Sequence, residues 1–119
     1  MDITFWQTYA SCWSAPEAER RRLLSRLAVR EVTYRDPNVE VQGQDAFSDY
    51  MGAFQRGFPG FRFAIARVDA HHGRSLAHWH LVDGAGTPVQ DGVSCAAHDD
   101  QGRLRDVTGF FPIAAPAAR

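Results

Sequence analysis

The second half of the chain alternates between strand-like segments and short turns, and this pattern limits the possible folds more than any other feature. Strands are predicted over residues 61–68, 75–82, 89–98 and 104–111. The turns between them contain glycine and are only a few residues long, as is typical of hairpin connections between antiparallel neighbours. The sequence therefore predicts an antiparallel sheet that needs helices to cover one of its faces.

Apolar residues at helical spacing predict three helices in the first half. The first covers about residues 2–13, and the second follows a capping box at residues 14–17 and continues to about Ala28. The third begins at Gly43, ends at residues 58–60, and places Phe47, Tyr50, Met51 and Phe54 on one face. A short strand over residues 31–35 precedes it. The order α-α-β-α-β-β-β-β predicts an α+β fold, in which a curved, mostly antiparallel sheet and the helices enclose a pocket.

The composition indicates a single globular domain over residues 1–119. The net charge is −1 and all 13 basic residues are arginine, which argues against a nucleic-acid partner and excludes a Schiff-base lysine or a P-loop. The basic run Arg20-Arg21-Arg22 is expected on a solvated helix face. No apolar run could cross a membrane and no signal peptide opens the chain, so we expect a cytoplasmic protein. Cys12 and Cys95 are expected to be reduced packing residues, and residues 114–119 a loose tail.

Asp36 is the residue most suggestive of chemistry, because it stands where the first strand breaks into a turn at Pro37. A carboxylate at the edge of an apolar enclosure is suited to act as a general base. Local sequence also allows a second interpretation, in which Asp36 only forms the Asx-type hydrogen bond of a turn. The sequence does not decide between the two.

Motifs along almost the whole chain resemble the SnoaL-like branch of the NTF2-like superfamily, whose members share a cystatin-like, cone-shaped α+β fold. The matching residues are Tyr34, Asp36-Pro37, Gly43, Asp45-Ala46, Pro59-Gly60-Phe61, His78-Trp79-His80-Leu81, Gly86, Gly92, Asp99, Gly102-Arg103-Leu104 and Val107-Thr108-Gly109-Phe110-Phe111. The resemblance implies a small-molecule pocket, but the fold hosts isomerases, cyclases, dehydratases, hydrolases and plain binding modules.

The placement of Tyr9 and Asp36 is similar to that of the oxyanion-binding tyrosine and the general base of ketosteroid isomerases in this superfamily. The resemblance therefore implies three catalytic candidates: Asp36 as the base, Tyr9 as the oxyanion donor, and Ser94 where those isomerases carry an acid. By the same comparison, the ligand pocket should be lined by Trp13, Tyr50, Phe54, Phe61, Phe63, Trp79, Leu81, Val107, Gly109 and Phe111. The expected partner is a small apolar, carbonyl-containing or cyclic molecule, and no cofactor is expected.

His78 and His80 share one strand face and could in principle hold a metal. No third ligand follows at a useful spacing, and the family comparison turns the opposite face, with Trp79 and Leu81, toward the pocket. We therefore expect no metal site, and we expect the outward face with His78 and His80 to form a homodimer. The rival interpretation of the whole chain is a non-catalytic ligand-binding or dimerisation module whose cone is filled by side chains.

Overall fold

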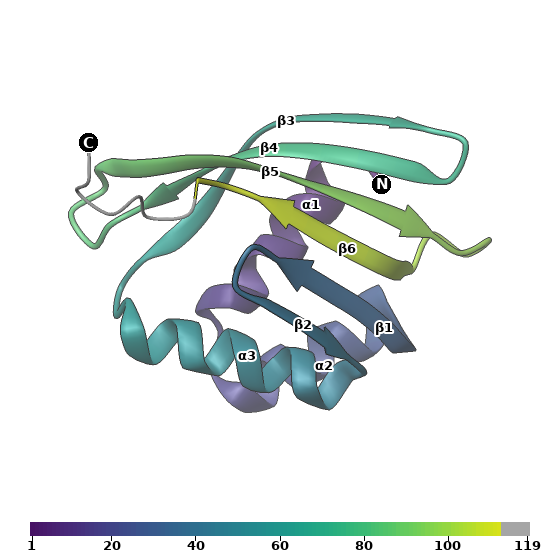
Figure 1. Ribbon diagram of the computed structural model, residues 1–119, viewed down its shortest axis with the longest axis horizontal. Coiled ribbons are helices and arrows are strands. Elements are labelled where there is room, and N and C mark those ends of the chain that lie inside the picture. The colour runs from purple at the N-terminus through teal and green to yellow at the C-terminus, as the bar shows by residue number, and fades with distance from the viewer. Residues whose placement is uncertain (113–119) are drawn as a thin grey trace.

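The computed structural model describes residues 1–112, which form three α-helices, one 3-10 turn and a six-stranded sheet (Figure 1). The elements are α1 (Ile3–Ser11), η1 (Cys12–Ser14), α2 (Glu17–Leu27), β1 (Ala28–Asp36), β2 (Val39–Gln42), α3 (Gln44–Gly57), β3 (Arg62–His71), β4 (Arg74–Val82), β5 (Pro88–His98) and β6 (Leu104–Phe110). The predicted α+β class is confirmed, and the predicted helices and strands occur in the predicted order, with β2 as one further strand. The expected tail lies outside the described residues.

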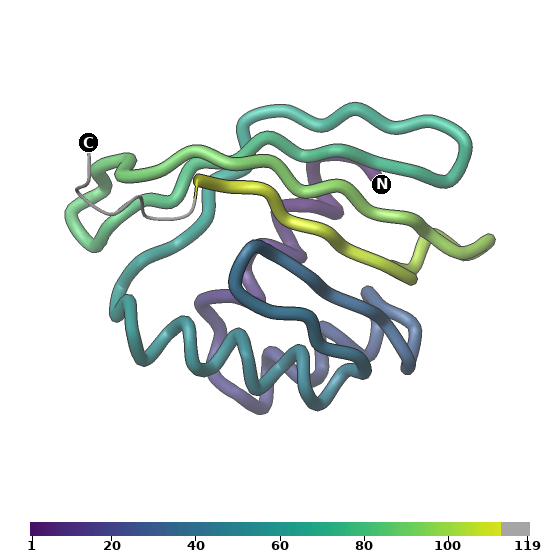
Figure 2. The backbone as a smooth tube through the Cα atoms, in the orientation of Figure 1, coloured from purple at the N-terminus to yellow at the C-terminus, as the bar shows by residue number. Residues whose placement is uncertain are grey.

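The sheet has the strand order β2-β1-β6-β5-β4-β3. Every neighbouring pair is antiparallel except β1 and β6, which are parallel and far enough apart in the chain for the crossover connection that a parallel pair requires. The register of β3 on β4 shifts between Ile65 and Arg67, and such a bulge bends a strand and increases its twist. In Figure 2 the strands β3 to β5 extend across one side of the molecule, while β1 and β2 turn toward α3.

The core lies between the helices and the sheet face turned toward them. Its largest fully buried side chains include Trp6, Leu24, Phe47, Met51 and Val107. The predicted apolar face of α3 supplies Phe47 and Met51, which are completely buried, and Tyr50 and Phe54, which are partly buried. Gly43 begins the helix at φ +94°, a backbone conformation that favours glycine. No helix within residues 1–112 is long and apolar enough to cross a membrane.

Two local predictions in the first half are wrong. Residues 14–17 do not form a capping box: Pro16 is the N-cap of α2 without a side-chain hydrogen bond, and Ser14 donates to the Phe61 carbonyl instead. Arg20, expected on a solvated face, is 5% exposed. Its guanidinium donates to Ser48 Oγ at 2.9 Å and to the Ala15 carbonyl at 3.1 Å, so it ties α2 to α3 and to η1.

The sequence also gave no indication of strand β2. Residues 39–42 are too short to be recognised by alternation alone, and they become a strand by pairing with β1 across the two-residue turn Pro37-Asn38. This pairing makes Asp36 the last residue of β1, opposite Val39.

Buried hydrogen bonds connect Trp6 to the start of β4 and the end of β5. The Trp6 indole donates to Ser75 Oγ at 3.0 Å, and Ser75 Oγ lies 2.7 Å from His98 Nε2. His98 Nδ1 lies 2.9 Å from the Gly102 carbonyl, which can only accept, so Nδ1 carries the proton and Nε2 accepts from Ser75. Burial lowers the pKa of His98, although the Gly102 carbonyl opposes this shift.

We predict that the free energy of unfolding decreases as the pH falls below about 6.5, the ordinary pKa of histidine. The unfolded chain then binds a proton at His98 that the folded chain does not bind until a lower pH, so acid favours unfolding. Denaturant titrations between pH 7 and pH 5.5 measure the slope. His98→Gln should flatten it, because glutamine does not bind a proton in this pH range. An unchanged slope in His98→Gln would contradict the prediction.

Candidate active site

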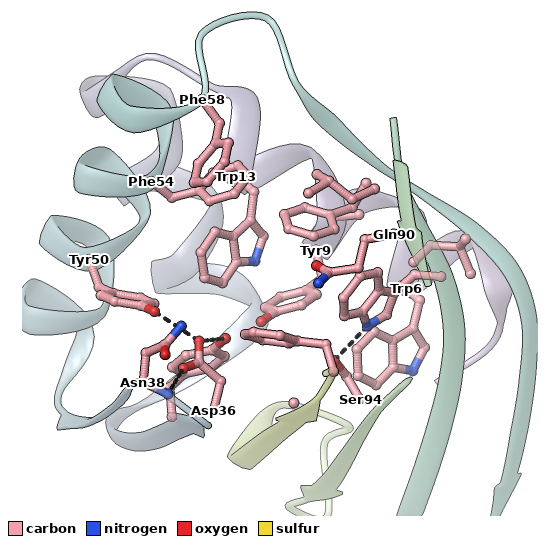
Figure 3. A pocket seen from close by; sticks show the side chains of 18 of the residues that line it. Trp6, Tyr9, Trp13, Asp36, Asn38, Tyr50, Phe54, Phe58, Gln90 and Ser94 are labelled. Atoms are coloured by element: carbon pink, nitrogen blue, oxygen red, sulfur yellow. Dashed lines mark hydrogen bonds between the residues drawn. The ribbon is translucent and has the colours of Figure 1, made fainter. Parts of the chain in front are cut away.

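A cavity of about 470 Å³ lies between the helices and the sheet face that they cover. Half of its lining residues are aromatic, and Asp36 is the only charged side chain among the lining residues that the structure describes (Figure 3). The lining residues are Trp6, Tyr9, Ala10, Trp13, Tyr34, Asp36, Asn38, Tyr50, Ala53, Phe54, Phe58, Phe63, Ile65, Trp79, Leu81, Gln90, Ser94, Gly109, Phe111 and Pro112. Its size and its few polar groups are typical of a site for a small organic molecule.

The Asp36 carboxylate accepts three hydrogen bonds at the edge of this cavity. Tyr34 and Tyr50 donate their hydroxyl protons to Oδ2 at 2.7 and 2.9 Å, and the Asn38 backbone N–H donates to Oδ1 at 2.8 Å. The Asn38 bond is the Asx-type turn bond that the sequence allowed. Asp36 is therefore a turn residue and a cavity residue at the same time.

The two phenols that hold Asp36 are neutral donors. Burial raises the pKa of Tyr34 and of Tyr50 well above the ordinary value, and the neighbouring Asp36 charge raises both further. Asp36 thus lies next to an apolar cavity with neutral hydrogen-bond donors and, among the lining residues of the described chain 1–112, without a positive partner.

Tyr9 projects from α1 into the same cavity. It is 5% exposed, and its ring packs edge-on against Trp6 with 5.3 Å between the ring centroids. Burial raises the pKa of Tyr9, the Trp13 side chain partly offsets this, and the Asp36 charge adds to the increase. The Tyr9 phenol is therefore un-ionised and can donate a hydrogen bond to a ligand.

Ser94 lies in the cavity wall on β5 and is held by a tryptophan of the neighbouring strand. The Trp79 indole donates to Ser94 Oγ at 3.0 Å (Figure 3). This contact depends on Gly92, because a Cβ at that position would lie 2.2 Å from Trp79 Cζ2. The absence of a side chain at Gly92 lets the Trp79 ring lie flat over β5 and reach Ser94.

Most of the residues predicted for the pocket lie on the cavity. The structure places there the three catalytic candidates and eight of the ten expected lining residues: Trp13, Tyr50, Phe54, Phe63, Trp79, Leu81, Gly109 and Phe111. The other two lie elsewhere. Val107 is fully buried in the core, and Phe61 packs edge-on against Phe58 in the loop before β3.

The sequence interpretation missed Tyr34 as a partner of Asp36. The signal was present, because residues two apart on a strand share a face, and Tyr34 precedes Asp36 by two positions. Trp6, Asn38 and Gln90 were also not assigned to the pocket. Trp6 reaches it because Ser75 anchors the indole N–H, a contact between residues 69 positions apart that no local pattern shows.

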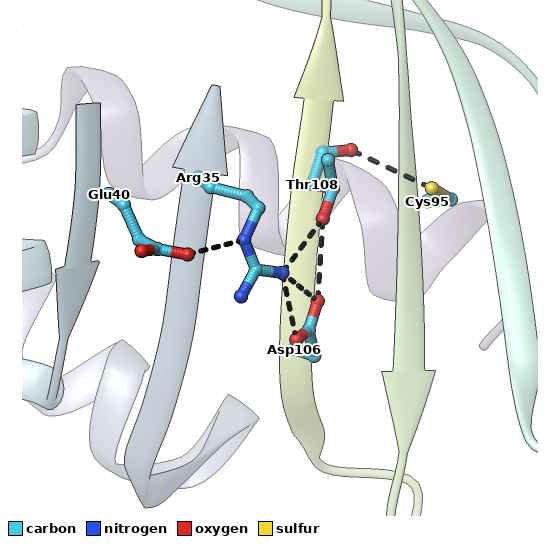
Figure 4. Close-up of polar contacts among 5 residues, drawn as sticks. All are labelled: Arg35, Glu40, Cys95, Asp106 and Thr108. Carbon is cyan, nitrogen blue, oxygen red and sulfur yellow. Dashed lines mark hydrogen bonds and ion pairs between the residues drawn. The ribbon is translucent and has the colours of Figure 1, made fainter. Parts of the chain in front are cut away.

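The opposite face of the sheet carries a charged cluster around Arg35 (Figure 4). Arg35 donates to Glu40 at 2.7 Å and to both oxygens of Asp106 at 3.0 Å, and these hydrogen bonds raise its pKa, with Glu40 as the larger cause. His80 Nδ1 lies 2.5 Å from Asp91 Oδ1 on the same face. No group of three or more His, Cys, Asp or Glu side chains in residues 1–112 is arranged to hold a metal ion.

Residues 6–107 match the model of the SnoaL-like domain family. A SnoaL-like protein from Agrobacterium tumefaciens str. C58, named as a candidate isomerase, is 28% identical, with a TM-score of 0.87 over 94% of this chain and 97% of that one. A SnoaL-like candidate polyketide cyclase from Jannaschia sp. CCS1 is 15% identical, with a TM-score of 0.73 over 92% and 86% of the two chains.

A protein with a cystatin-like fold from Methylobium petroleophilum PM1 is 20% identical, with a TM-score of 0.72 over 98% of this chain and 80% of that one. At such identities, the Jannaschia and Methylobium proteins show the shared fold alone. No curated protein matches the chain.

We predict that Gly92→Ala destabilises the protein and displaces Trp79. The new methyl group would overlap the indole ring, and overpacking of this kind costs on the order of 1–3 kcal/mol. Thermal melts and near-ultraviolet circular dichroism measure the loss of stability and the changed tryptophan environment. Gly57→Ala is the control, because a Cβ there meets open space at the end of α3 and should be neutral or stabilising. Equal melting temperatures for the two variants would contradict the close packing of Trp79 against Gly92.

Proposed function

Because this chain belongs to the SnoaL-like domain family, we propose that it is an enzyme that moves a proton within a small apolar, carbonyl-containing or cyclic substrate. The observation that carries the proposal is the Asp36 carboxylate, held by Tyr34 and Tyr50 at the edge of a cavity with otherwise uncharged walls. The candidate isomerase from Agrobacterium tumefaciens among the similar structures supports a reaction of this class.

In the proposed reaction Asp36 is the general base. A base must be positioned before it accepts a proton, and the three hydrogen bonds to the Asp36 oxygens hold this carboxylate in place. They occupy three of about four lone-pair positions, so one remains for a substrate proton. Apolar walls exclude water, which strengthens the interaction between the carboxylate and an acidic hydrogen.

Tyr9 is the proposed donor to the oxygen on which negative charge develops. Its neutral phenol lies in the same cavity as Asp36, and a preorganised donor in a water-poor site stabilises an oxyanion more than water does. Ser94 is the proposed second donor, since its oxygen accepts from Trp79 and its own proton remains available. These side chains supply base and donors, so the mechanism invokes no cofactor.

The alternative proposal is a non-catalytic binding module of the same fold. The Asx-type bond of Asp36 favours it, because that bond gives Asp36 a structural role without chemistry. The cavity of about 470 Å³ argues against a cone completely filled by side chains, but a binding protein would need such a cavity as well. Turnover, rather than binding, therefore distinguishes the two functions.

We predict that the protein accelerates exchange of carbon-bound hydrogen for deuterium in cyclic ketones dissolved in D₂O. Proton abstraction beside a carbonyl is detected in this way by NMR, without knowledge of the natural substrate. A panel of 2-indanone, 2-tetralone and cyclohexanone covers a range of sizes. Asp36→Asn should reduce the exchange rate on the order of 100-fold or more, the usual size of a general-base contribution.

Asp106→Asn is the matched control for this experiment. It makes the same chemical change at a carboxylate that also accepts hydrogen bonds, but on the opposite face of the sheet (Figure 4). It should retain the exchange rate of the wild type. Full activity in Asp36→Asn would rule out Asp36 as the base. Binding of the ketones by the wild-type protein without any exchange would favour the non-catalytic module.

We further propose that the outward sheet face forms a homodimer. Phe110 on β6 and Val89 on β5 are 55% and 52% exposed, and a second copy would cover these apolar side chains. Light scattering at micromolar concentration should give the mass of two chains. Phe110→Glu should shift the protein toward a monomer, whereas Ile3→Glu, at an exposed apolar residue on α1, should not. A monomeric wild-type protein would contradict the proposal.

A further inference from the structure

Asp36 gives the cavity a negative charge that no basic side chain balances. Among the lining residues from 1–112 there is no lysine, arginine or histidine, and the carboxylate accepts its hydrogen bonds from neutral groups. The preceding residue, Arg35, lies on the opposite face of the sheet, where it pairs with Glu40 and Asp106. The field in the cavity therefore attracts a cation and disfavours an anion.

Aromatic rings lie directly beside the same carboxylate. The hydroxyl groups of Tyr34 and Tyr50 donate to Asp36 Oδ2, so both rings adjoin it. Trp13 packs against both tyrosines, with 5.5 and 5.9 Å between the ring centroids, and Figure 3 shows Trp13, Tyr50 and Tyr9 around Asp36. The faces of such rings carry negative potential and attract cations. A positive group beside Asp36 thus meets a carboxylate and several aromatic rings together.

The hydrogen bonds that Asp36 already accepts limit the kind of cation that fits. They leave about one of four lone-pair positions on the carboxylate. A primary ammonium group carries three N–H donors and is strongly hydrated, so it could give the carboxylate only one of them. A tertiary ammonium group has a single N–H, and a quaternary one has none and makes its contacts through methyl groups. Aromatic sites typically recognise cations of this kind.

The position of Asp36 allows a charged group to reach it from solvent. Asp36 is half-buried and the adjacent Asn38 is exposed, as is Phe58, which also lines the cavity. Trp6 and Trp79 are 0% and 7% exposed and form buried walls of the same cavity. A ligand can therefore keep its charge near the opening while its apolar part fills the interior.

We propose that the cavity binds tertiary or quaternary ammonium compounds that carry an aromatic or alicyclic body, with the cationic nitrogen beside Asp36. This ligand class goes beyond the proposed function, because it requires the charge of Asp36 but no turnover. A quaternary ammonium group offers the carboxylate no acidic hydrogen. It occupies the place of the substrate hydrogen beside the base, so such compounds inhibit the ketone exchange by competition.

The experiment uses benzyltrimethylammonium, whose charge is independent of pH, and 2-tetralone as the uncharged reference. Isothermal titration calorimetry at constant ionic strength measures both dissociation constants. In the wild type the cation should bind, and 2-tetralone should displace it. Asp36→Asn should raise the dissociation constant of the cation about tenfold or more, as expected for loss of a charge contact in a site shielded from water. The dissociation constant of 2-tetralone should change no more than about twofold, which shows that the cavity is intact.

Three further variants separate charge from shape. Asp36→Ser can also form the turn hydrogen bond, so it should weaken binding of the cation as Asp36→Asn does and serves if that variant does not fold. Asp36→Glu keeps the charge and should keep most of the affinity for the cation. Asp106→Asn removes one charge on the opposite face and should have no effect.

Affinity for the cation that stays unchanged in Asp36→Asn and Asp36→Ser, or that falls equally in Asp106→Asn, would overturn the proposal. Absence of competition between the cation and 2-tetralone in the wild type would overturn it without any variant. Because these measurements do not depend on turnover, the two proposals can fail separately. Ketone exchange without binding of the cation would leave Asp36 as the base, and binding of the cation without exchange would leave a protein that binds ammonium compounds.

Discussion

The arrangement of the elements around the cavity depends on the hydrogen bonds that one carboxylate accepts. Asp36 faces a cavity that residues 1–112 line with aromatic rings and without a cationic side chain, so its charge must be stabilised by hydrogen bonds from neutral groups. Tyr34 on β1, Tyr50 on α3 and the Asn38 N–H in the β1–β2 turn supply them. These three donors come from three elements, and the carboxylate therefore fixes the turn, the strand and the helix relative to one another.

The tryptophans extend the same principle to the walls. An indole N–H left unpaired in an apolar site is costly, and a paired one leaves a purely apolar ring surface. Trp6 donates to Ser75, which is held by His98, and Trp79 donates to Ser94, which faces the cavity. Ser75 lies outside the cavity lining and Ser94 lies within it. The first contact therefore leaves only an apolar ring surface in the cavity wall, whereas the second also places a hydroxyl group there.

Period-two alternation and helical spacing predicted much of the fold and part of the site. Alternation along β4 correctly separated Trp79 and Leu81 from His78 and His80, because each strand of a covered sheet has one buried face. It could not show that Arg20 is buried, since this depends on an acceptor in α3 and on a carbonyl in η1. Strand β2 and the position of Val107 likewise depend on contacts across the sheet and core that no window of sequence contains.

The alternation of β1 also determines the charge of the cavity. Tyr34 and Asp36 point to the cavity, and Arg35 between them points to the opposite face, where Glu40 and Asp106 neutralise it. Arg35 therefore cannot approach the Asp36 carboxylate without a reversal of the strand. A ligand that carries a negative charge would meet Asp36 and no basic side chain from residues 1–112, and a buried like-charge pair is strongly unfavourable. An uncharged ligand avoids this cost, and one with an acidic hydrogen can also approach the Asp36 carboxylate as an acceptor. The strand whose charge disfavours anions in the cavity is thus the strand that presents the proposed base.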